Sequence, residues 1–212
     1  HLQKTLTKRV GSTIIRDYWI KKKKFTPYTE RWVDWKILHK SINGLNRNRQ
    51  QWHSKWLSGF CRVGVMMQLY QSHYHSKCPR CLSDRENVNH VMQCPHPKAR
   101  EKWKETVEKL EIWLVDNDAH PEMKKTIISS LQAWNETKPF PTVMTNNVTL
   151  KEAVKQQDQI GWRPFLDGFI STQWRQCQKE HMEKNQSTKS PELWMAKMQR
   201  KLWNIPWEMW DS

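Results

Sequence analysis

Residues 78–97 read CPRCLSDRENVNHVMQCPHP and bring three cysteines and two histidines together in one short segment. Two residues separate Cys78 from Cys81, eight separate Cys81 from His90, and three separate His90 from Cys94. Thiolates two residues apart can bind one metal ion from a tight turn. Residues four positions apart share one face of a helix. The segment therefore predicts a metal site of the Cys-Cys-His-Cys (CCHC) type.

Three thiolates and one imidazole complete a tetrahedral Zn²⁺ site and leave no open coordination position. Such closed sites stabilise the fold of a small module and perform no chemistry. We therefore expect a structural zinc ion as the cofactor. His96 is an alternative to His90 as the fourth ligand, whereas His73 and His75 are expected to be surface residues.

The other two of the five cysteines, Cys61 and Cys177, are expected to be reduced, buried thiols. An odd number of cysteines, three of them clustered beside a histidine, fits a metal site better than a disulfide framework. No stretch approaches the roughly 18 to 20 apolar residues that span a bilayer, and no signal peptide is recognisable. The sequence thus favours a reducing compartment, nuclear or cytoplasmic, without a membrane partner or a small-molecule substrate.

The chain is strongly basic, with 36 Lys and Arg residues against 21 Asp and Glu residues among 212, a net charge of +15. This excess favours a polyanionic partner, and RNA or DNA is the expected one. Candidate contacts are the basic residues of an N-terminal run and of the metal segment: Lys21, Lys22, Lys23, Lys24, Lys77, Arg80, Arg85, Lys98 and Arg100. The alternative is that these side chains form only a solvated basic surface.

Apolar residues recur at helical spacing through most of the chain, and no strand pattern competes. The expected fold is all-α, a bundle of about six to eight helices with a small CCHC zinc-binding insert. Helices are predicted over residues 29–42, 49–60, 97–115, 120–134, 148–159, 162–183 and from 191 onward, with a short helix between 61 and 77. Pro206 should interrupt the last of them.

Three regions are expected along the chain. Residues 1–28 form a basic arm, with an extended piece near Val10 to Ile15. Residues 29–134 form a helical region that contains the zinc module, 73–97. Residues 148–212 form a tryptophan-rich helical region. Because the sequence ends inside a predicted helix, we expect a fragment of a longer protein.

Fourteen tryptophans supply much of the apolar surface. Their spacing on the predicted helices indicates that most of them are buried. An exposed tryptophan beside basic residues can instead stack on unpaired bases. The best candidates for such a platform lie in the last helix, where basic residues are interspersed with Trp194, Trp203, Trp207 and Trp210.

The segment Cys78-Pro-Arg-Cys81, followed by Glu86, His90 and Cys94-Pro95, resembles the zinc-binding region that follows the polymerase in reverse transcriptases of LINE-type (non-LTR) retroelements. Open reading frames of protist retroelements carry further similar patterns. These patterns correspond to residues 55–60 (KWLSGF), residues 160–168 (IGWRPFLDG) and a C-terminal tryptophan-rich helix like residues 202–210. The resemblance covers most of residues 30–212.

The resemblance implies a nucleic-acid-binding accessory domain that engages template RNA or target DNA beside the upstream reverse transcriptase domain of the same polyprotein. It carries over only the four metal ligands. The polymerase's paired aspartates and the Pro-Asp dipeptide of the associated nuclease are missing, and Asp158, Asp167 and Glu180 are expected to be solvated or paired. We therefore expect no enzyme. A second hypothesis is a protein-interaction module that braces the polymerase without touching nucleic acid.

Overall fold

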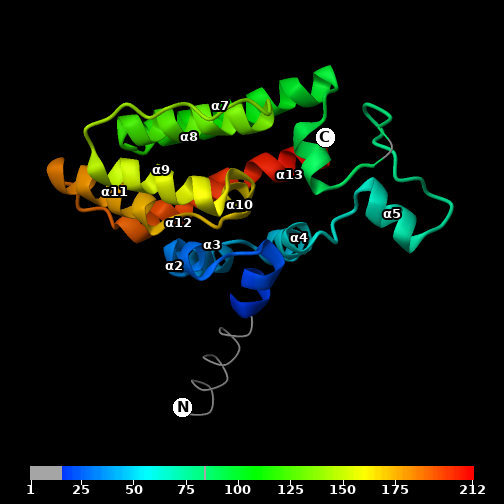
Figure 1. Ribbon diagram of the computed structural model, residues 1–212, viewed down its shortest axis with the longest axis horizontal. Coiled ribbons are helices and arrows are strands. Elements are labelled where there is room, and N and C mark those ends of the chain that lie inside the picture. The colour runs from blue at the N-terminus through cyan, green and yellow to red at the C-terminus, as the bar shows by residue number, and fades with distance from the viewer. Residues whose placement is uncertain (1–15, 84) are drawn as a thin grey trace, which may run out of the picture.

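The computed structural model describes residues 16–83 and 85–212, and the described chain is all-α (Figure 1). Residues 16–23 are helical. Twelve further helices follow: α2 (Pro27–Trp32), α3 (Trp35–Asn43), α4 (Arg47–Ser58), α5 (Gly64–Tyr70), α6 (Val88–Gln93), α7 (Pro97–Asp116), α8 (Pro121–Asn135), α9 (Val148–Ile160), α10 (Trp162–Asp167), α11 (Thr172–Lys184), α12 (Pro191–Leu202) and α13 (Asn204–Asp211). The predicted fold class is confirmed. The helix number exceeds six to eight because three predicted helices are split and Val88–Gln93 forms the short helix α6.

The predicted helix 29–42 is divided into α2 and α3 at Val33 and Asp34. The Asp34 carboxylate accepts a hydrogen bond from the Ile37 backbone N–H at 3.2 Å and so caps α3. The Asp34 N–H donates to the carbonyl of Ile170 at 2.8 Å, and Val33 forms an isolated bridge with Ser171. A tertiary contact therefore breaks a helix that periodicity alone predicts as continuous.

The predicted helix 162–183 is divided by Gly168, which has a left-handed φ of +98°. Backbone N–H groups of Gly168 and Phe169 close the end of α10, and the Ser171 hydroxyl then caps α11. The predicted junction at Gly161 is confirmed. Helices α12 and α13 meet at Trp203, so the predicted interruption near Pro206 is also present. Pro206 itself lies in the first turn of α13, where its missing N–H leaves no hydrogen bond unmade.

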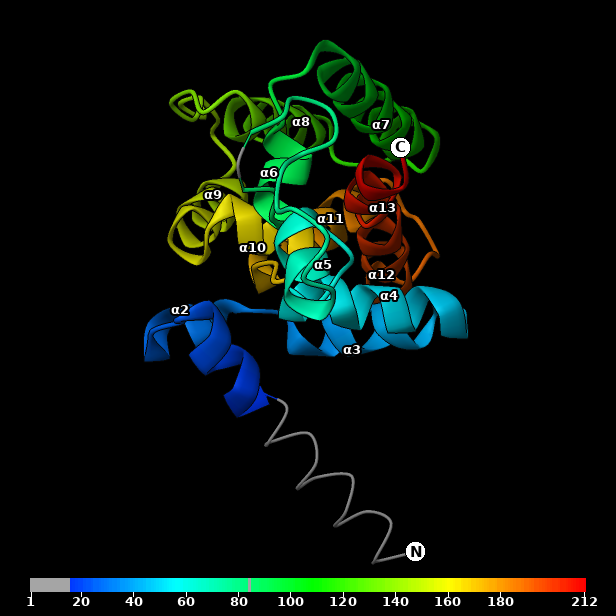
Figure 2. The same cartoon turned by 90° about the vertical axis from the view of Figure 1, so that its right-hand side faces the viewer.

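The helices stack in three layers, seen along two directions in Figures 1 and 2. Helices α7 and α8 form one outer layer, α9 to α13 the middle, and α2 to α4 the other outer layer. Helix α5 and its flanking loops project at one end (Figure 1). One buried cluster draws apolar side chains from both 29–134 and 148–212, so these two predicted regions share a core. The predicted extended piece near Val10 to Ile15 lies outside the described residues.

A buried glutamine, Gln157, holds the turn between α10 and α11. Gln157 donates to the carbonyls of Gly161 and Phe169 at 3.1 and 3.2 Å, and its own oxygen accepts from the Ser171 N–H and the Trp174 indole. All hydrogen-bonding groups of this side chain are therefore used. A buried amide that is fully satisfied fixes one local geometry, because any other arrangement would leave it unpaired.

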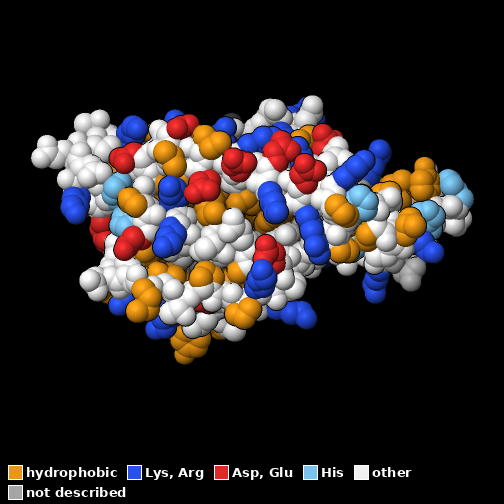
Figure 3. Space-filling model, turned by 90° about the horizontal axis from the view of Figure 1, so that it is seen from above, with side chains coloured by type: hydrophobic (Ala, Val, Ile, Leu, Met, Phe, Trp, Pro, Cys, Tyr) orange, Lys and Arg blue, Asp and Glu red, His pale blue; other side chains and the backbone are white. Residues whose placement is uncertain are grey.

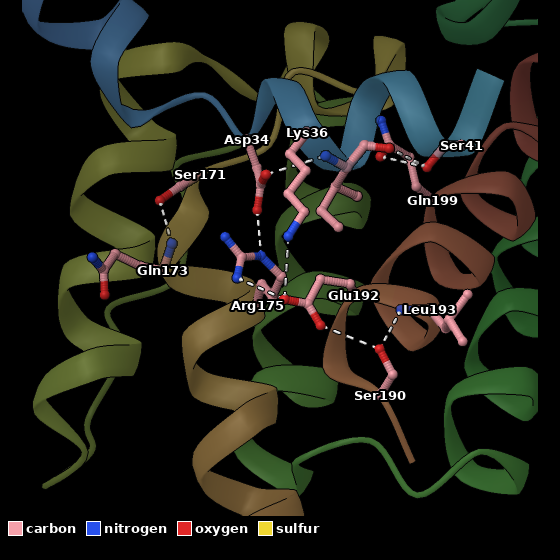
Figure 4. A network of polar contacts seen from close by, with 11 residues as sticks. Asp34, Lys36, Ser41, Ser171, Gln173, Arg175, Ser190, Glu192, Leu193 and Gln199 are labelled. Atoms are coloured by element: carbon pink, nitrogen blue, oxygen red, sulfur yellow. Dashed lines mark hydrogen bonds and ion pairs between the residues drawn. The ribbon is translucent and has the colours of Figure 1, made fainter. Parts of the chain in front are cut away.

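An ionic network joins α11 and α12 to α3, as Figure 4 shows. Arg175 donates to Asp34 at 2.6 Å and lies 3.7 Å from Glu192. Lys36 lies 3.6 Å from the same Glu192 carboxylate. The carboxylate that caps α3 is thus also the partner of Arg175, which ties the split between α2 and α3 to the middle layer.

Part of the predicted N-terminal arm packs on the body. Lys23 donates to the fully buried carboxylate of Asp167 at 2.7 Å, and Arg163 pairs with the same carboxylate. The rings of Trp19 and Phe25 lie 6.0 and 5.3 Å from that of Phe169. The described end of residues 1–28 is therefore a docked helix, and Lys23 neutralises a buried acid.

The tryptophans of the last helices behave mainly as core residues. Trp194 and Trp203 are buried. Trp207 and Trp210 are half-buried and pack with Trp52, whose ring lies 4.9 Å from that of Trp207. The expectation that most of these indoles lie in the core is confirmed.

Replacing Gly168 by alanine is expected to destabilise the protein by about 2 to 4 kcal/mol, because a left-handed φ and overpacking both oppose a side chain. A Cβ at Gly168 would lie 2.2 Å from the Gln199 amide nitrogen and 2.6 Å from the Trp203 ring. Gly59 provides a matched control, since it has φ +81° but no atom within 4 Å. Gly59→Ala should cost about 1 kcal/mol. Urea denaturation measures both, and equal losses would contradict the proposed close packing.

His53 is buried in the core beside Trp203, with ring centroids 3.8 Å apart, and neither of its ring nitrogens has a hydrogen-bond partner. Burial lowers the pKa of His53 from 6.5 to about 3. The unfolded chain therefore takes up a proton below pH 6.5 that the folded protein does not. Stability must fall as the pH falls from 6.5 toward 3.

The His53→Leu variant should lose this acid sensitivity. Between pH 7 and pH 4.5 its unfolding free energy should fall by about 2.5 kcal/mol less than that of the wild type. Denaturation at each pH measures the difference, which cancels acid effects shared by both proteins. His39→Gln alters an exposed histidine and should follow the wild type. Parallel curves for wild type and His53→Leu would show that His53 is not held neutral.

Candidate metal centre

The first two ligands lie on a tight turn between α5 and α6. The Cys78 N–H donates to the Ser83 carbonyl and the Leu82 N–H donates to the Cys78 carbonyl, both at 2.9 Å. Leu82 adopts φ +61°, which reverses the chain directly after Cys81. The predicted tight turn therefore exists and turns both thiols to the same side.

The other two ligands are placed by α6 and the residue that follows it. The Asn87 side chain accepts hydrogen bonds from the N–H groups of Asn89 and His90 and so caps α6. The helix ends at Gln93, so Cys94 lies just beyond it with φ −57° and ψ 127°. The prediction that one helical face presents both ligands is therefore only partly right. Pro95 explains the difference, because a proline excludes the α conformation from the residue before it.

The four side chains converge. Their ligand atoms all lie within 4.8 Å of one another. The Cys81 sulfur lies 3.2 Å from His90 Nε2, and the sulfurs of Cys78 and Cys94 are 3.9 Å apart. Cys78 and Cys94 are buried, whereas Cys81 and His90 are half-buried. This cluster could hold a metal ion, and it is the one the sequence predicted.

The structure also decides between His90 and the alternative ligand. His96 lies outside the cluster, where its Nδ1 accepts from the Lys98 N–H and caps α7. His73 and His75 are exposed on the loop before Cys78, as expected. The predicted thiols outside the cluster, Cys61 and Cys177, are both free and buried.

Burial raises the pKa of the Cys78 thiol to about 12 and raises the pKa of Cys94 as well. Both thiols are therefore held in their neutral form when no cation is bound. A metal ion that binds the cluster displaces these protons to solvent, because a coordinating thiol is deprotonated.

The metal segment is joined to the rest of the fold on two sides. Glu86 is buried and accepts from the Gly64 N–H at 2.8 Å, which ties the turn to the start of α5. Arg80 donates to the carbonyl of Met209 at 2.7 Å, and the Trp210 indole donates to the carbonyl of Arg62 at 2.9 Å. These contacts link the segment to α13. The sequence pattern predicted neither the contact of Glu86 with Gly64 nor the contact of Arg80 with α13.

The predicted nucleic-acid contacts lie on several parts of the fold, and two of them, Arg80 and Lys98, line one cleft together. The Arg80 side chain donates a hydrogen bond to the backbone of α13, and Lys23 pairs with the buried Asp167 carboxylate. Lys98 and Arg100 face two separate clefts, each of which also contains glutamates. The other predicted contacts lie exposed at scattered places: Lys21, Lys22, Lys24, Lys77 and Arg85.

The three acidic residues considered as a nuclease set are held by separate partners. Asp158 accepts from the Trp162 indole at 2.8 Å, and Asp167 pairs with two basic residues. Glu180 accepts from Thr149 and Gln176 at 3.0 Å. The expectation that they are paired is confirmed.

No helix among the described residues is long and apolar enough to cross a membrane.

Comparison of the chain with protein-family models, with curated protein sequences and with solved structures finds no match.

The Cys81→Ser variant should lose the bound metal and the local structure of residues 73–100, because the metal stabilises a segment with little core of its own. Hydrogen exchange across 73–100 should rise sharply, as it should when a chelator is added to the wild type. Metal analysis of the purified protein should give one ion per chain.

Cys61→Ala serves as the control, since it removes a buried thiol outside the cluster and should keep the metal. A wild-type protein that contains no metal and whose exchange ignores the chelator would refute the metal centre.

Proposed function

We propose that this chain is a nucleic-acid-binding accessory domain, stabilised by structural zinc, that works beside the reverse transcriptase of a non-LTR retroelement. The observation that carries the proposal is the net charge of +15 on a folded helical body. A surface with this excess attracts phosphate groups and releases their condensed counterions. The zinc ion is assigned an architectural role because all four ligand positions come from the protein.

The choice of zinc rests on ligand type and spacing. Thiolate and imidazole donors in a Cys₃His set are typical of structural Zn²⁺. A tetrahedral ion with Zn–S bonds of about 2.3 Å requires its sulfur ligands to lie about 3.8 Å apart. The separation of 3.9 Å between the sulfurs of Cys78 and Cys94 agrees with that requirement.

The retroelement role is supported by how the resembling segments pack. The patterns at residues 55–60, 78–95, 160–168 and 202–210 are far apart in sequence, yet each contributes residues to one buried cluster. In residues 160–168, Phe165 and Leu166 are fully buried and Gly168 makes the close turn against Trp203. These four segments therefore pack into one folded unit.

A second candidate is the protein-interaction module. Five large apolar side chains between residues 60 and 82 are exposed: Phe60, Leu69, Tyr70, Tyr74 and Leu82. They surround α5, toward the end of the molecule where Figure 3 shows apolar and histidine side chains together. An apolar surface of this kind is typical of a protein contact. It favours docking of the neighbouring polymerase at this end and is compatible with nucleic-acid binding elsewhere.

Labelled RNA or DNA should bind the purified, metal-loaded protein at low ionic strength and dissociate as salt is added. The logarithm of the binding constant should fall linearly with the logarithm of salt concentration, by about 0.9 per phosphate contact on a duplex and about 0.7 on a single strand. Fluorescence anisotropy measures this slope. Absence of binding at low salt, or binding that ignores salt, would overturn the proposal and leave the interaction module.

A further inference from the structure

A groove of about 530 Å³ lies where the α3–α4 loop, α7, α12 and the start of α13 meet. Its walls come from four separate parts of the chain. It is lined by Gly44, Leu45, Asn46, Arg49, Trp113, Lys197, Arg200, Lys201 and Asn204. Lys197, Arg200 and Lys201 are the basic residues of the last predicted helix that stand among its tryptophans, whereas Arg49 and Trp113 were not predicted as nucleic-acid contacts.

The charge of this groove distinguishes it from the two larger clefts. Four of its nine lining residues are basic and none is acidic. The cleft of about 940 Å³ between α7 and α8 combines basic residues with Glu108, Glu111 and Glu136. The cleft of about 720 Å³ beside Pro79 contains Glu101 and Glu105. In those clefts a phosphate would meet carboxylates, whereas no carboxylate lines the groove.

Some other basic side chains on the body are held in ion pairs with carboxylates. Lys102 and Lys109 of α7 share Glu105 and Glu208, with distances of 2.6 to 3.3 Å. The surface seen in Figure 3 accordingly mixes basic and acidic side chains. The four basic residues of the groove form no ion pair with any carboxylate of the described residues. Their charge therefore remains available to a ligand.

Arg49 is held in place by neighbouring side chains, whereas two of the lysines are exposed. Arg49 donates to the Asn204 side chain at 2.8 Å and lies over the Trp207 ring at 4.3 Å from its centroid. Burial lowers the pKa of Arg49, and the neighbouring Glu208 carboxylate partly offsets this effect. Lys197 and Lys201 are exposed and lie four residues apart on α12, one turn above the other.

One aromatic wall completes the groove. Trp113 is half-buried, and its ring packs against that of Trp194 with centroids 5.6 Å apart. One part of the indole is therefore anchored in the core while another part faces the groove. Anchored tryptophans beside basic residues are the platforms on which unpaired bases stack.

We propose that this groove is the principal site at which the chain binds single-stranded nucleic acid, with phosphates held by Arg49, Lys197, Arg200 and Lys201 and a base stacked on Trp113. The inference rests on the proposed function and names the site for it. A duplex keeps its bases stacked inside and offers only phosphates to such a groove. An unpaired strand uses both the cations and the indole.

The Lys197→Gln, Lys201→Gln double variant tests the phosphate contacts. With a single strand of about ten nucleotides, a length in the range such sites cover, it should bind at least tenfold more weakly than wild type at low salt. Its salt slope should fall by about 1.4, since each lost contact with a single strand removes about 0.7.

The Lys151→Gln, Lys155→Gln double variant is the matched control. It removes the same charge from two exposed lysines, also four residues apart, on α9. It should keep most of the wild-type affinity. If both double variants lose the same affinity and slope, binding depends on net charge alone and the groove assignment is wrong, while the proposed function stands.

The Trp113→Leu variant tests stacking separately from charge. Wild type should bind the normal strand about tenfold more tightly than an abasic strand with the same number of phosphates. Trp113→Leu should erase this preference but bind the abasic strand as wild type does. Equal binding of both strands by wild type would refute the stacking role, and DNA and RNA versions of each strand distinguish the two sources of the ligand.

Loss of fold is monitored independently by circular dichroism and by metal content. If the wild type binds no nucleic acid at all, both the groove and the proposed function fail. If the wild type binds and the groove variants bind equally well, the groove alone fails.

Discussion

The close approach of Trp203 to the backbone of Gly168 is the constraint on which the architecture depends. At this point α12 and α13 meet the turn between α10 and α11, and a single added carbon would lie 2.6 Å from the indole ring. The Gln199 amide donates to the Gly168 carbonyl at 2.6 Å and accepts from the Ser41 hydroxyl at 3.0 Å. The same contact therefore positions α3 against α12. Once these elements are fixed, the residues after Gly168 can supply the Ile170 carbonyl to Asp34 and divide α2 from α3.

Features that depend on local sequence could be predicted, and features that depend on distant partners could not. The ligands Cys78, Cys81 and Cys94 follow from spacing within one segment, and most helix boundaries follow from prolines and periodicity. Asp34 breaks a helix because Ile170 and Arg175, more than a hundred residues later, occupy its backbone and side chain. A charge count likewise could not locate a basic groove. Arg49 lines the same groove as Lys197 and Lys201 only because folding brings it to Asn204, at the start of α13.

Buried polar groups explain why the basic residues of this chain divide into two kinds. Asp167 is fully buried and would be strongly unfavourable without Lys23 and Arg163. Asp34 is also buried, and its carboxylate is paired with Arg175. These cations are committed to the fold, so they add little to an external field. The excess of basic residues attracts an anion most strongly where basic side chains lie together and no carboxylate lines the same surface. The groove beside Trp113 is lined in this way.

The metal centre and the groove are separate in space but connected through α13. Arg80, one residue before Cys81, holds the carbonyl of Met209 near the end of that helix. Asn204, at its start, lines the groove and accepts from Arg49. Since α13 is a single short helix, an anchor at one end restricts the position of the other. In the proposed function, a metal ion held by the Cys₃His cluster would therefore help to order the proposed binding groove without touching it.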